Sequence, residues 1–244
     1  MRIPRICVFD PLAVGMEVVL PEQAGEHLAR VLRLERGHPL VLFNGEGREY
    51  RAEIAQLAKR AVTARVLDES PAVDRESPLA LTLVQGVARG EKMDLILQKA
   101  TELGIRRIVP VISERTEVKL DAERTGRRLA HWQAVIAGAC EQSGRSVLPV
   151  LDAPQRLAAW AGALGDEPGL RLALDPQGTT SLRTLAPFAS AMLMVGPEGG
   201  LSEQDLYVLD LAGFVGLKLG PRILRTETAG LAAIAALQAL HGDL

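Results

Sequence analysis

The sequence predicts an α/β protein in two parts, a small β-rich barrel that carries one helix and then a mostly parallel sheet covered by helices. Up to Leu67, short runs that mix apolar and polar residues are separated by turn residues, as is typical of strands. A polar segment at 68–78, with prolines near both ends, reads as a linker. After it, apolar runs alternate with helical patterns, which indicates βα units. We place the domain boundary between residues 72 and 73.

The first part contains five predicted strands and one predicted helix. The strands are Ile3–Phe9, Glu17–Leu20, Leu40–Asn44, Tyr50–Leu57 and Ala61–Leu67. The helix is expected over Glu22–Leu34, because Pro21 is a residue type favoured at helix starts. Gly45 and Gly47 supply a tight hairpin turn between two of the strands.

The second part alternates strands and helices. The predicted strands are Leu79–Val84, Ile108–Ile112, Val147–Val150, Leu170–Leu174, Ala191–Val195 and Val215–Leu219. The predicted helices are Glu91–Leu103, Arg127–Glu141, Leu182–Ala186, Glu203–Leu211 and Ala229–Leu240. Strands that are apolar along most of their length are typical of a parallel sheet with both faces covered.

Composition limits the possible functions. The chain has 244 residues, 48% of them hydrophobic, which is enough for one or two real cores. Its net charge of −2 argues against a nucleic-acid binder held by bulk charge, but leaves room for a one-sided basic face. The pattern shows no signal peptide or membrane span, so we expect a cytoplasmic protein. Cys7, Cys140 and four scattered histidines match no metal-ligand spacing, so no metal is expected.

Two glycine-rich segments, 195–200 and 217–229, are the strongest indication of a binding site. Each follows a predicted strand and precedes a predicted helix, where α/β proteins bind ligands. We therefore expect one pocket with two walls, and Asp175 after a third strand as another wall. Neither segment has the pattern of a dinucleotide fingerprint or of a phosphate loop. The first segment has a simpler alternative, a turn that leads to a helix capped by Ser202.

Arg225 is the first candidate for a catalytic residue. It stands at the predicted start of the last helix, where Thr226 can act as the cap. A cation is locally unfavourable at a helix N-terminus, and local rules tend to fail at functional sites. The alternative is an ordinary surface arginine.

The chain resembles, over nearly its full length, the bacterial RsmE-type methyltransferases, which modify a uridine N3 in 16S ribosomal RNA. The resemblance rests on the stretches His27–Arg33, Gln98–Gly104, Glu141–Arg145, Val195–Glu203 and Leu217–Ala229. It implies a PUA-like RNA-binding barrel at 1–72 and a SPOUT methyltransferase domain with a trefoil knot at 73–244. It also implies a homodimer and the cofactor S-adenosylmethionine, held in a bent shape by the knotted loops.

The same resemblance implies the site residues. The implied cofactor-binding residues are Leu174, Asp175, Val195, Gly196, Pro197, Glu198, Gly199, Leu217, Lys218, Leu219, Gly220, Ile223, Leu224, Thr226 and Thr228. We expect apolar side chains to flank the adenine ring and backbone groups to bind its edge.

For catalysis we expect Arg225 to stabilise negative charge on the uracil carbonyls as the N3 proton leaves. The sequence does not identify the general base, and the candidates are Glu198, Glu141 and Glu227. For Glu198 an alternative of equal weight is a structural role, in which its negative charge stabilises the positive end of the helix dipole. Arg30, Arg33 and Arg145 are expected to contact RNA phosphates, with a solvated surface as the alternative for the N-terminal arginines.

Three other functions compete with uridine-N3 methylation. A ribose 2′-O RNA methyltransferase is the second choice, because the knotted fold serves both reactions. A noncatalytic RNA-binding assembly factor would leave the glycine-rich loops without a purpose. A nucleotide-dependent enzyme of the doubly wound type lacks its sequence fingerprint.

Overall fold

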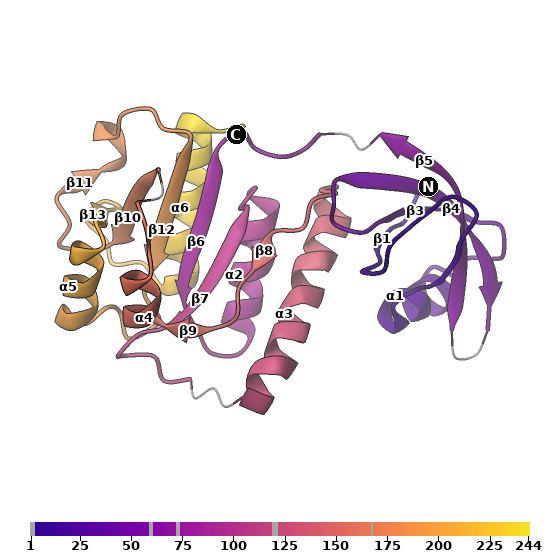
Figure 1. Ribbon diagram of the computed structural model, residues 1–244, viewed down its shortest axis with the longest axis horizontal. Coiled ribbons are helices and arrows are strands. Elements are labelled where there is room, and N and C mark those ends of the chain that lie inside the picture. Colours follow the sequence, from indigo (N-terminus) through magenta and orange to yellow (C-terminus); the bar gives the residue numbers. More distant parts are fainter. Residues whose placement is uncertain (1–2, 59–60, 72–73, 119–121, 167) are drawn as a thin grey trace. The chain divides into compact units, whose positions relative to one another are not determined.

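The structure, a computed structural model, describes residues 3–58, 61–71, 74–118, 122–166 and 168–244. The chain forms two compact units, Met1–Glu76 together with Ala137–Leu148, and Ser77–Ile136 together with Pro149–Leu244. Figure 1 shows the elements of both. The first unit thus includes the end of a long helix that a boundary between residues 72 and 73 assigns to the second part. That boundary stays a prediction for the domains.

The first unit is built on a five-stranded sheet, with a short helical segment between its second and third strands. Its strands are β1 (Arg5–Cys7), β2 (Glu17–Val19), β3 (Pro39–Phe43), β4 (Arg48–Leu57) and β5 (Val62–Pro71), in the order β1-β3-β4-β5-β2. β1 and β3 are parallel and the other pairs are antiparallel. Leu28, Leu42 and Ile54 are fully buried in its core. All five predicted strands are confirmed.

The helical segment is shorter than predicted. α1 (Glu22–Glu26) begins after Pro21, as expected, and continues as one π-helical stretch, His27–Val31. The predicted helix extended to Leu34, but Arg33 has a φ of 51°. Because a left-handed residue cannot continue a right-handed helix, the helix ends before it.

The predicted linker is partly strand. β5 continues through Pro71, and its last four residues pair with Arg48–Arg51 of β4. Arg48 forms an ion pair with Glu69 at 2.9 Å, and Arg51 pairs with Asp68. The polar composition of this stretch therefore reflects an exposed strand pair, not a linker, over residues 68–71.

The last turns of α3 (Ala122–Ser143) belong to the first unit. Cys140 and Ala137 pack with Cys7 and Phe43 in a small buried cluster. Both cysteines are free and buried, as the sequence predicted. Burial, followed by the nearby Glu141 charge, raises the pKa of Cys7 to about 12, so its thiol is inert at neutral pH.

The second unit is built on one parallel sheet. Its strands are β6 (Ala80–Gly86), β7 (Arg107–Ile112), β8 (Val150–Leu151), β9 (Gln155–Arg156), β10 (Leu170–Leu174), β11 (Thr180–Ser181), β12 (Ser190–Val195) and β13 (Val215–Lys218). The order is β11-β13-β10-β12-β6-β7-β8, with β9 beside β7. Every strand pair of this sheet in the described chain is parallel, which confirms the prediction.

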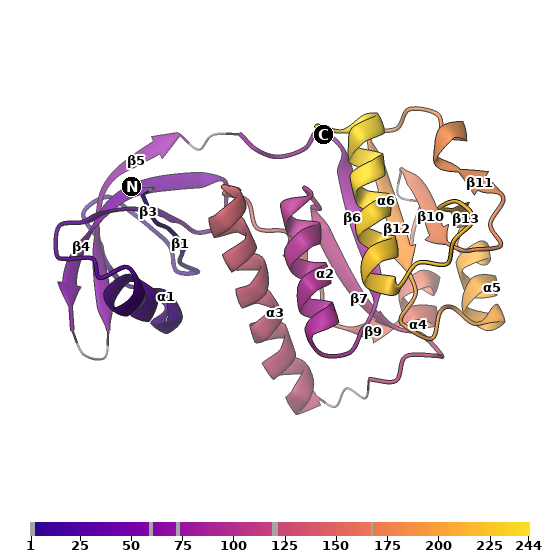
Figure 2. The ribbon, with the colours of Figure 1, turned by 180° about the vertical axis from the view of Figure 1, so that it is seen from behind.

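Helices cover both faces of this sheet. α2 (Glu91–Glu102) and α6 (Thr226–His241) lie on one face, and α4 (Leu157–Gly162) and α5 (Glu203–Leu211) lie on the other (Figures 1 and 2). α2 ends at Glu102, and Gly104, two residues later, has a φ of 82°, which suits the glycine that closes a helix. Trp160 of α4 is buried against Phe214, with 6.0 Å between the ring centroids.

Two predicted elements of the second unit differ in the structure, and one segment forms elements that were not predicted. The strand expected at Val147–Val150 becomes the two-residue β8, shifted toward Leu151. The helix expected at Leu182–Ala186 is a single 3₁₀ turn, η2 (Leu182–Thr184). The Ala/Gly-rich segment after residue 153, for which the sequence predicted nothing, forms β9 and α4.

Candidate cofactor and catalytic site

A cavity of about 510 Å³ opens in the second unit where three strands end. β10, β12 and β13 are parallel, so their carboxyl ends meet at one edge of the sheet. The cavity is lined by Lys92, Arg115, Leu174, Asp175, Pro176, Val195, Gly196, Pro197, Glu198, Gly200, Leu201, Leu206, Leu217, Leu219, Gly220, Arg222, Ile223, Leu224, Arg225, Thr226, Glu227 and Ala229. The expectation of one pocket with both glycine-rich segments and Asp175 as walls is confirmed.

The first glycine-rich loop folds tightly on itself. A Cβ on Gly196 would lie 3.1 Å from the carbonyl carbon of Gly200 and 3.1 Å from Leu201 Cγ. The loop leads into α5, whose N-cap Ser202 and Asp205 form the expected capping box: each backbone N–H donates to the other's side chain at 3.0 Å. The capped-helix interpretation and the pocket interpretation are therefore both true of this loop.

The second glycine-rich loop carries Arg225 at the start of α6. Arg225 itself is the N-cap residue, with an extended backbone and an exposed side chain. Thr226, which the sequence predicted as the cap, is instead the first helical residue, and the N-cap Arg225 makes no side-chain capping bond. Its hydroxyl reaches toward the other loop, where it donates to the Gly196 carbonyl oxygen at 2.6 Å.

Glu198 is held by donors from α2 and the loop before it. Its Oε1 accepts from the Arg89 N–H at 3.1 Å and from Lys92 Nζ at 3.3 Å. Partial burial raises the pKa of Glu198, but these donors and its own backbone N–H outweigh burial and hold the pKa below its ordinary value. A carboxylate with a lowered pKa is a weak proton acceptor.

Glu227 lines the same cavity with a different environment. Its Oε2 atom is buried and has no hydrogen-bond partner in the part of the chain that the structure describes. A buried carboxylate oxygen without a partner is unfavourable, so a cationic or hydrogen-bonding ligand in the cavity would stabilise it.

Most of the predicted cofactor residues line the cavity, but three do not. Lys218 follows the buried Leu217 on β13, so the alternation of a strand turns it to the exposed side. Thr228 is exposed on the first turn of α6. Gly199 is exposed and packs against Arg115, from which its carbonyl oxygen accepts a hydrogen bond at 3.3 Å.

Glu141, a candidate base, lies outside the cavity lining. It is on the part of α3 that belongs to the first unit, and its Oε1 accepts from the Cys7 N–H at 2.9 Å. Burial raises the pKa of Glu141, although the Cys7 hydrogen bond and the Arg5 charge oppose the shift. Its catalytic role stays a prediction.

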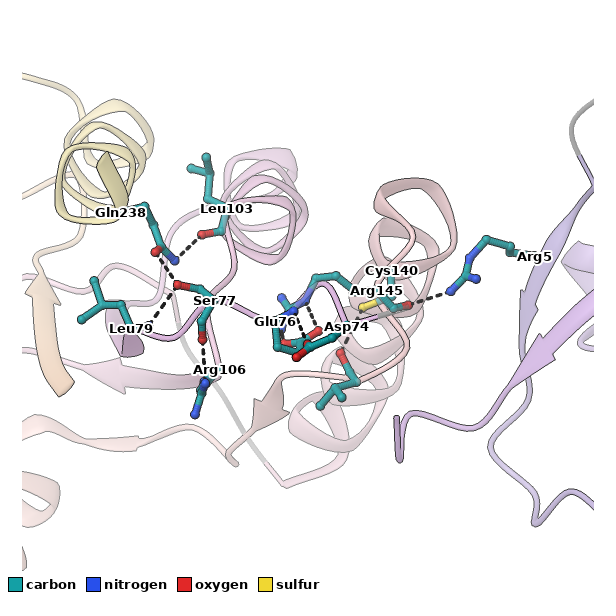
Figure 3. A network of polar contacts seen from close by, with 11 residues as sticks. Arg5, Asp74, Glu76, Ser77, Leu79, Leu103, Arg106, Cys140, Arg145 and Gln238 are labelled. Atoms are coloured by element: carbon teal, nitrogen blue, oxygen red, sulfur yellow. Dashed lines mark hydrogen bonds and ion pairs between the residues drawn. The ribbon is translucent and has the colours of Figure 1, made fainter. Parts of the chain in front are cut away.

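The three arginines predicted to bind RNA have different environments. Arg30 is exposed and pairs with Glu26 at 2.9 Å, and Arg33 is also exposed. The Arg145 side chain is only 3% exposed, and its guanidinium binds the Glu76 carboxylate through two atoms, at 3.0 and 2.5 Å (Figure 3). The prediction of a phosphate contact from Arg145 gains no support from this geometry.

Sequence reasoning missed three polar or charged residues of the site. Lys92 and Arg115 line the cavity from outside the glycine-rich segments, and nothing in their local sequence indicates this. Gln85 is fully buried at the end of β6 and donates to Thr226 Oγ1 at 3.1 Å. The sequence does contain an indication of this role, because a polar residue at the end of an apolar strand needs a buried hydrogen-bond partner.

The described residues contain no group of three or more His, Cys, Asp and Glu side chains arranged to hold a metal ion. Within the same residues, none of the helices combines the length and the apolar character that a membrane crossing requires.

Family models match both parts of the chain. A model described as an RNA methyltransferase domain matches residues 75–238. A second, described as an RNA methyltransferase PUA domain, matches residues 20–67. The cavity and its two loops fall inside the first match.

Named relatives and solved structures agree with these matches. The ribosomal RNA small subunit methyltransferase E of Buchnera aphidicola (from Schizaphis graminum) is 31% identical, over 100% of this chain and 98% of the relative. The Neisseria gonorrhoeae enzyme of that name, solved bound to S-adenosylmethionine, is 41% identical over 99% of each chain with a TM-score of 0.91. A Legionella pneumophila protein solved with the same cofactor is 38% identical over 100% of each chain, with a TM-score of 0.93. The chain belongs to the ribosomal RNA small subunit methyltransferase E family.

Proposed function

We propose that this protein transfers a methyl group from S-adenosylmethionine to N3 of a uridine in the 16S RNA of the small ribosomal subunit. The observation that carries the proposal is the cavity between the two glycine-rich loops, in a chain whose relatives bear the rRNA methyltransferase name. Two similar proteins were solved with S-adenosylmethionine.

The cavity suits this cofactor in size and lining. Its volume of about 510 Å³ is within the ordinary range of small-molecule sites. Val195 and Leu217 are buried side chains at two strand ends, and we assign them to the walls around the adenine. Carbonyl and N–H groups of the two loops would bind the adenine edge, which requires no charged side chain.

Glu227 provides the electrostatic part of the fit. The cofactor carries positive charge on its sulfonium and its ammonium group. Glu227 lines the cavity, and its carboxylate, whose buried Oε2 has no hydrogen-bond partner among the described residues, carries the opposite charge. We therefore assign Glu227 the role of a counter-charge for the cofactor.

Arg225 acts on the RNA base in this proposal. When bound, S-adenosylmethionine supplies an electrophilic methyl group. Uridine N3 is protonated and occupied when the base is paired, so the base must be unpaired or flipped out, at a cost of about a few kcal/mol. The N3 proton passes to solvent water. The exposed Arg225 guanidinium donates hydrogen bonds to the uracil carbonyl oxygens and stabilises the negative charge that the departing proton leaves on the base.

Cations at the cavity mouth and on the first unit would bind the RNA backbone. Arg115 and Arg222 are exposed, and Lys92 is partly exposed, at the cavity wall. On the first unit we assign phosphate contacts to Arg30 and Arg33. Filter binding at low salt tests this: alanine variants of these two arginines that keep wild-type RNA affinity would refute it.

The family resemblance also supports a cytoplasmic homodimer. Ile223 and Leu211 of the second unit are 85% and 70% exposed, large apolar side chains that a second copy could cover. Sedimentation equilibrium should give twice the 26.2 kDa chain mass, and a monomer at micromolar concentration would refute the dimer. Cell fractionation should recover the protein with ribosomal subunits.

Nucleoside mass spectrometry tests the reaction itself. Small subunits from a strain that lacks this protein, incubated with purified protein and S-adenosylmethionine, should gain 3-methyluridine at one site. A 2′-O-methyl nucleoside would support the ribose methyltransferase alternative instead. Binding to the subunits without any methylated product would support the noncatalytic assembly factor.

A further inference from the structure

One hydroxyl joins three segments behind the cavity. Thr226 Oγ1 donates to the Gly196 carbonyl oxygen at 2.6 Å and accepts from Gln85 Nε2 at 3.1 Å. Gln85 Nε2 also donates to the Gly86 carbonyl oxygen at 2.9 Å. The end of β6, the first loop and the first residue of α6 therefore meet at a single oxygen atom.

This junction is buried and tightly packed. Gln85 is 0% exposed and Thr226 is 7% exposed. Gln85 lies beside Val195 in the sheet register, so it is next to the end of the strand from which the first loop departs. A Cβ on Gly86 would lie 2.5 Å from the Pro197 nitrogen, which shows how closely the end of β6 supports that loop.

The amide of Gln85 determines where the Thr226 proton points. A hydroxyl has one proton to donate and lone pairs to accept. Because the Gln85 amide donates to Thr226 Oγ1, the hydroxyl proton is left for the Gly196 carbonyl. The orientation of one buried side chain thus fixes the hydrogen bond to the loop.

Both ends of this hydrogen bond belong to the proposed site. Gly196 lines the cavity as the first residue of the first loop. Thr226 follows Arg225, the N-cap residue, and precedes Glu227. A shift of the Gly196 carbonyl would therefore move the start of α6, and Arg225 with it.

We propose that Gln85 and Thr226 are positioning residues that couple the cofactor loop to the catalytic arginine. The pair holds the loop in the shape that accepts the cofactor, and it holds Arg225 in register with the methyl group to be transferred. This inference rests on the proposed function. It assigns Thr226 a role through its neighbours, not as a direct ligand, and it adds Gln85 to the site.

The test uses Thr226→Val, which keeps the shape of the side chain but removes the hydroxyl, and Thr226→Ser, which keeps the hydroxyl. For Thr226→Val, cofactor Kd should rise and kcat at saturating cofactor should fall, each by about tenfold, the effect of one lost buried hydrogen bond. Thr226→Ser should restore both values to near the wild type. Gln85→Met, which removes the amide donor, should reproduce the Thr226→Val effects and carries the test if that variant does not fold.

A matched control comes from a second buried hydroxyl of the same unit. Ser77 Oγ donates to Gln238 Oε1 at 2.7 Å and accepts from the Leu79 N–H at 3.1 Å (Figure 3). Gln238 is on α6, about 18 Å along the helix from Thr226 at 1.5 Å per residue. Ser77→Ala should lower the Tm and leave cofactor Kd and kcat unchanged.

The outcomes separate this inference from the proposed function. If Thr226→Val and Gln85→Met lower the Tm but keep the wild-type Kd and kcat at temperatures where the variants are folded, the positioning role is wrong and the methyltransferase proposal stands. If the wild-type protein itself binds no S-adenosylmethionine, the proposed function is wrong.

Discussion

Arg225 occupies a position that is electrostatically unfavourable for a cation in an isolated helix. As the N-cap of α6 it brings a positive charge to the positive end of the helix dipole. Such placement costs about 0.3–1 kcal/mol at an exposed site. The sequence predicted the conflict but not the N-cap itself, because it took Thr226 as the cap, and the structure places Arg225 there.

The first prediction concerns Arg225→Ala. We expect kcat to fall about 10²- to 10³-fold, as when one donor to a developing oxyanion is removed. Cofactor Kd should stay near the wild-type value, and the Tm should hold or rise slightly because the dipole conflict is gone. Single-turnover methylation, calorimetry and thermal unfolding measure the three quantities.

Arg222→Ala is the matched control, since Arg222 is an exposed cation of the same loop that also lines the cavity. Its kcat should keep the order of magnitude of the wild type. An Arg225→Ala enzyme with wild-type turnover on small subunits would contradict the role assigned to Arg225.

The second prediction concerns Glu227→Gln. Loss of the counter-charge should raise the KM for S-adenosylmethionine about 10- to 100-fold and change kcat little, because a hydrogen bond to a charged group is lost. Glu203→Gln is the control, since Glu203 is an exposed first-turn carboxylate of α5 outside the cavity lining. A fall in kcat at unchanged KM would contradict the counter-charge role and would identify Glu227 as the proton acceptor.

Which candidate residues lie at the site depends on the burial of each side chain and on its hydrogen-bond and ion-pair partners, and no sequence pattern encodes these. Glu198 and Glu141 are both acidic residues in motif-like stretches, yet one is at the cavity and the other supports Cys7. Arg145 carries the same charge as Arg30, but its guanidinium is paired with Glu76. Lys92 and Arg115 lie in segments whose local sequence does not indicate a binding site.

At the scale of elements, the last turns of α3 bring a buried carboxylate, Glu141, into the first unit. Glu141 accepts a hydrogen bond from Cys7 in a largely buried place, and burial raises its pKa above the ordinary value of 4.5. The unfolded chain therefore ionises first. The stabilising contribution is present below pH 4.5 and is lost as the pH rises through the raised folded-state pKa.

The third prediction follows for Glu141→Gln. The amide keeps an acceptor for the Cys7 N–H and cannot ionise, so its Tm relative to the wild type should be higher at pH 8 than at pH 4. Thermal unfolding at both pH values measures this difference. A variant whose relative Tm is lower at pH 8 would contradict the account, and lost turnover at unchanged Tm would support a catalytic role for Glu141.

Glu49→Gln is a control with the opposite sign. Burial raises the pKa of Glu49, but hydrogen bonds from Ser146 and Arg5 and the Arg5 charge outweigh it and hold the pKa below its ordinary value. Its stabilising contribution is present above the unfolded-state pKa and is lost as the pH falls. The relative Tm of Glu49→Gln should therefore be lower at pH 8 than at pH 4.

Elements whose pattern was local were predicted well, and those that depend on distant partners were not. The five strands of the first unit follow from their alternation and turn residues. The extension of β5 to Pro71 depends on pairing with β4, and the short α4 depends on the packing of Trp160 against Phe214. Neither partner is visible within the segment itself.

For the whole molecule, alternation alone predicted a parallel sheet with helices on both faces. Parallel strands bring their carboxyl ends to one edge, so two glycine-rich segments about twenty residues apart became two walls of one cavity. Periodicity contains no information about how loops thread, so the trefoil knot implied by the resemblance stays a prediction.

The most direct test is a crystal structure of the protein grown with S-adenosylmethionine. The account predicts one cofactor molecule per chain, in density bounded by Leu174, Val195 and Leu217, with its sulfonium group on the side of Arg225. Cofactor bound elsewhere on the chain, or a cavity that stays empty at saturating concentration, would contradict it.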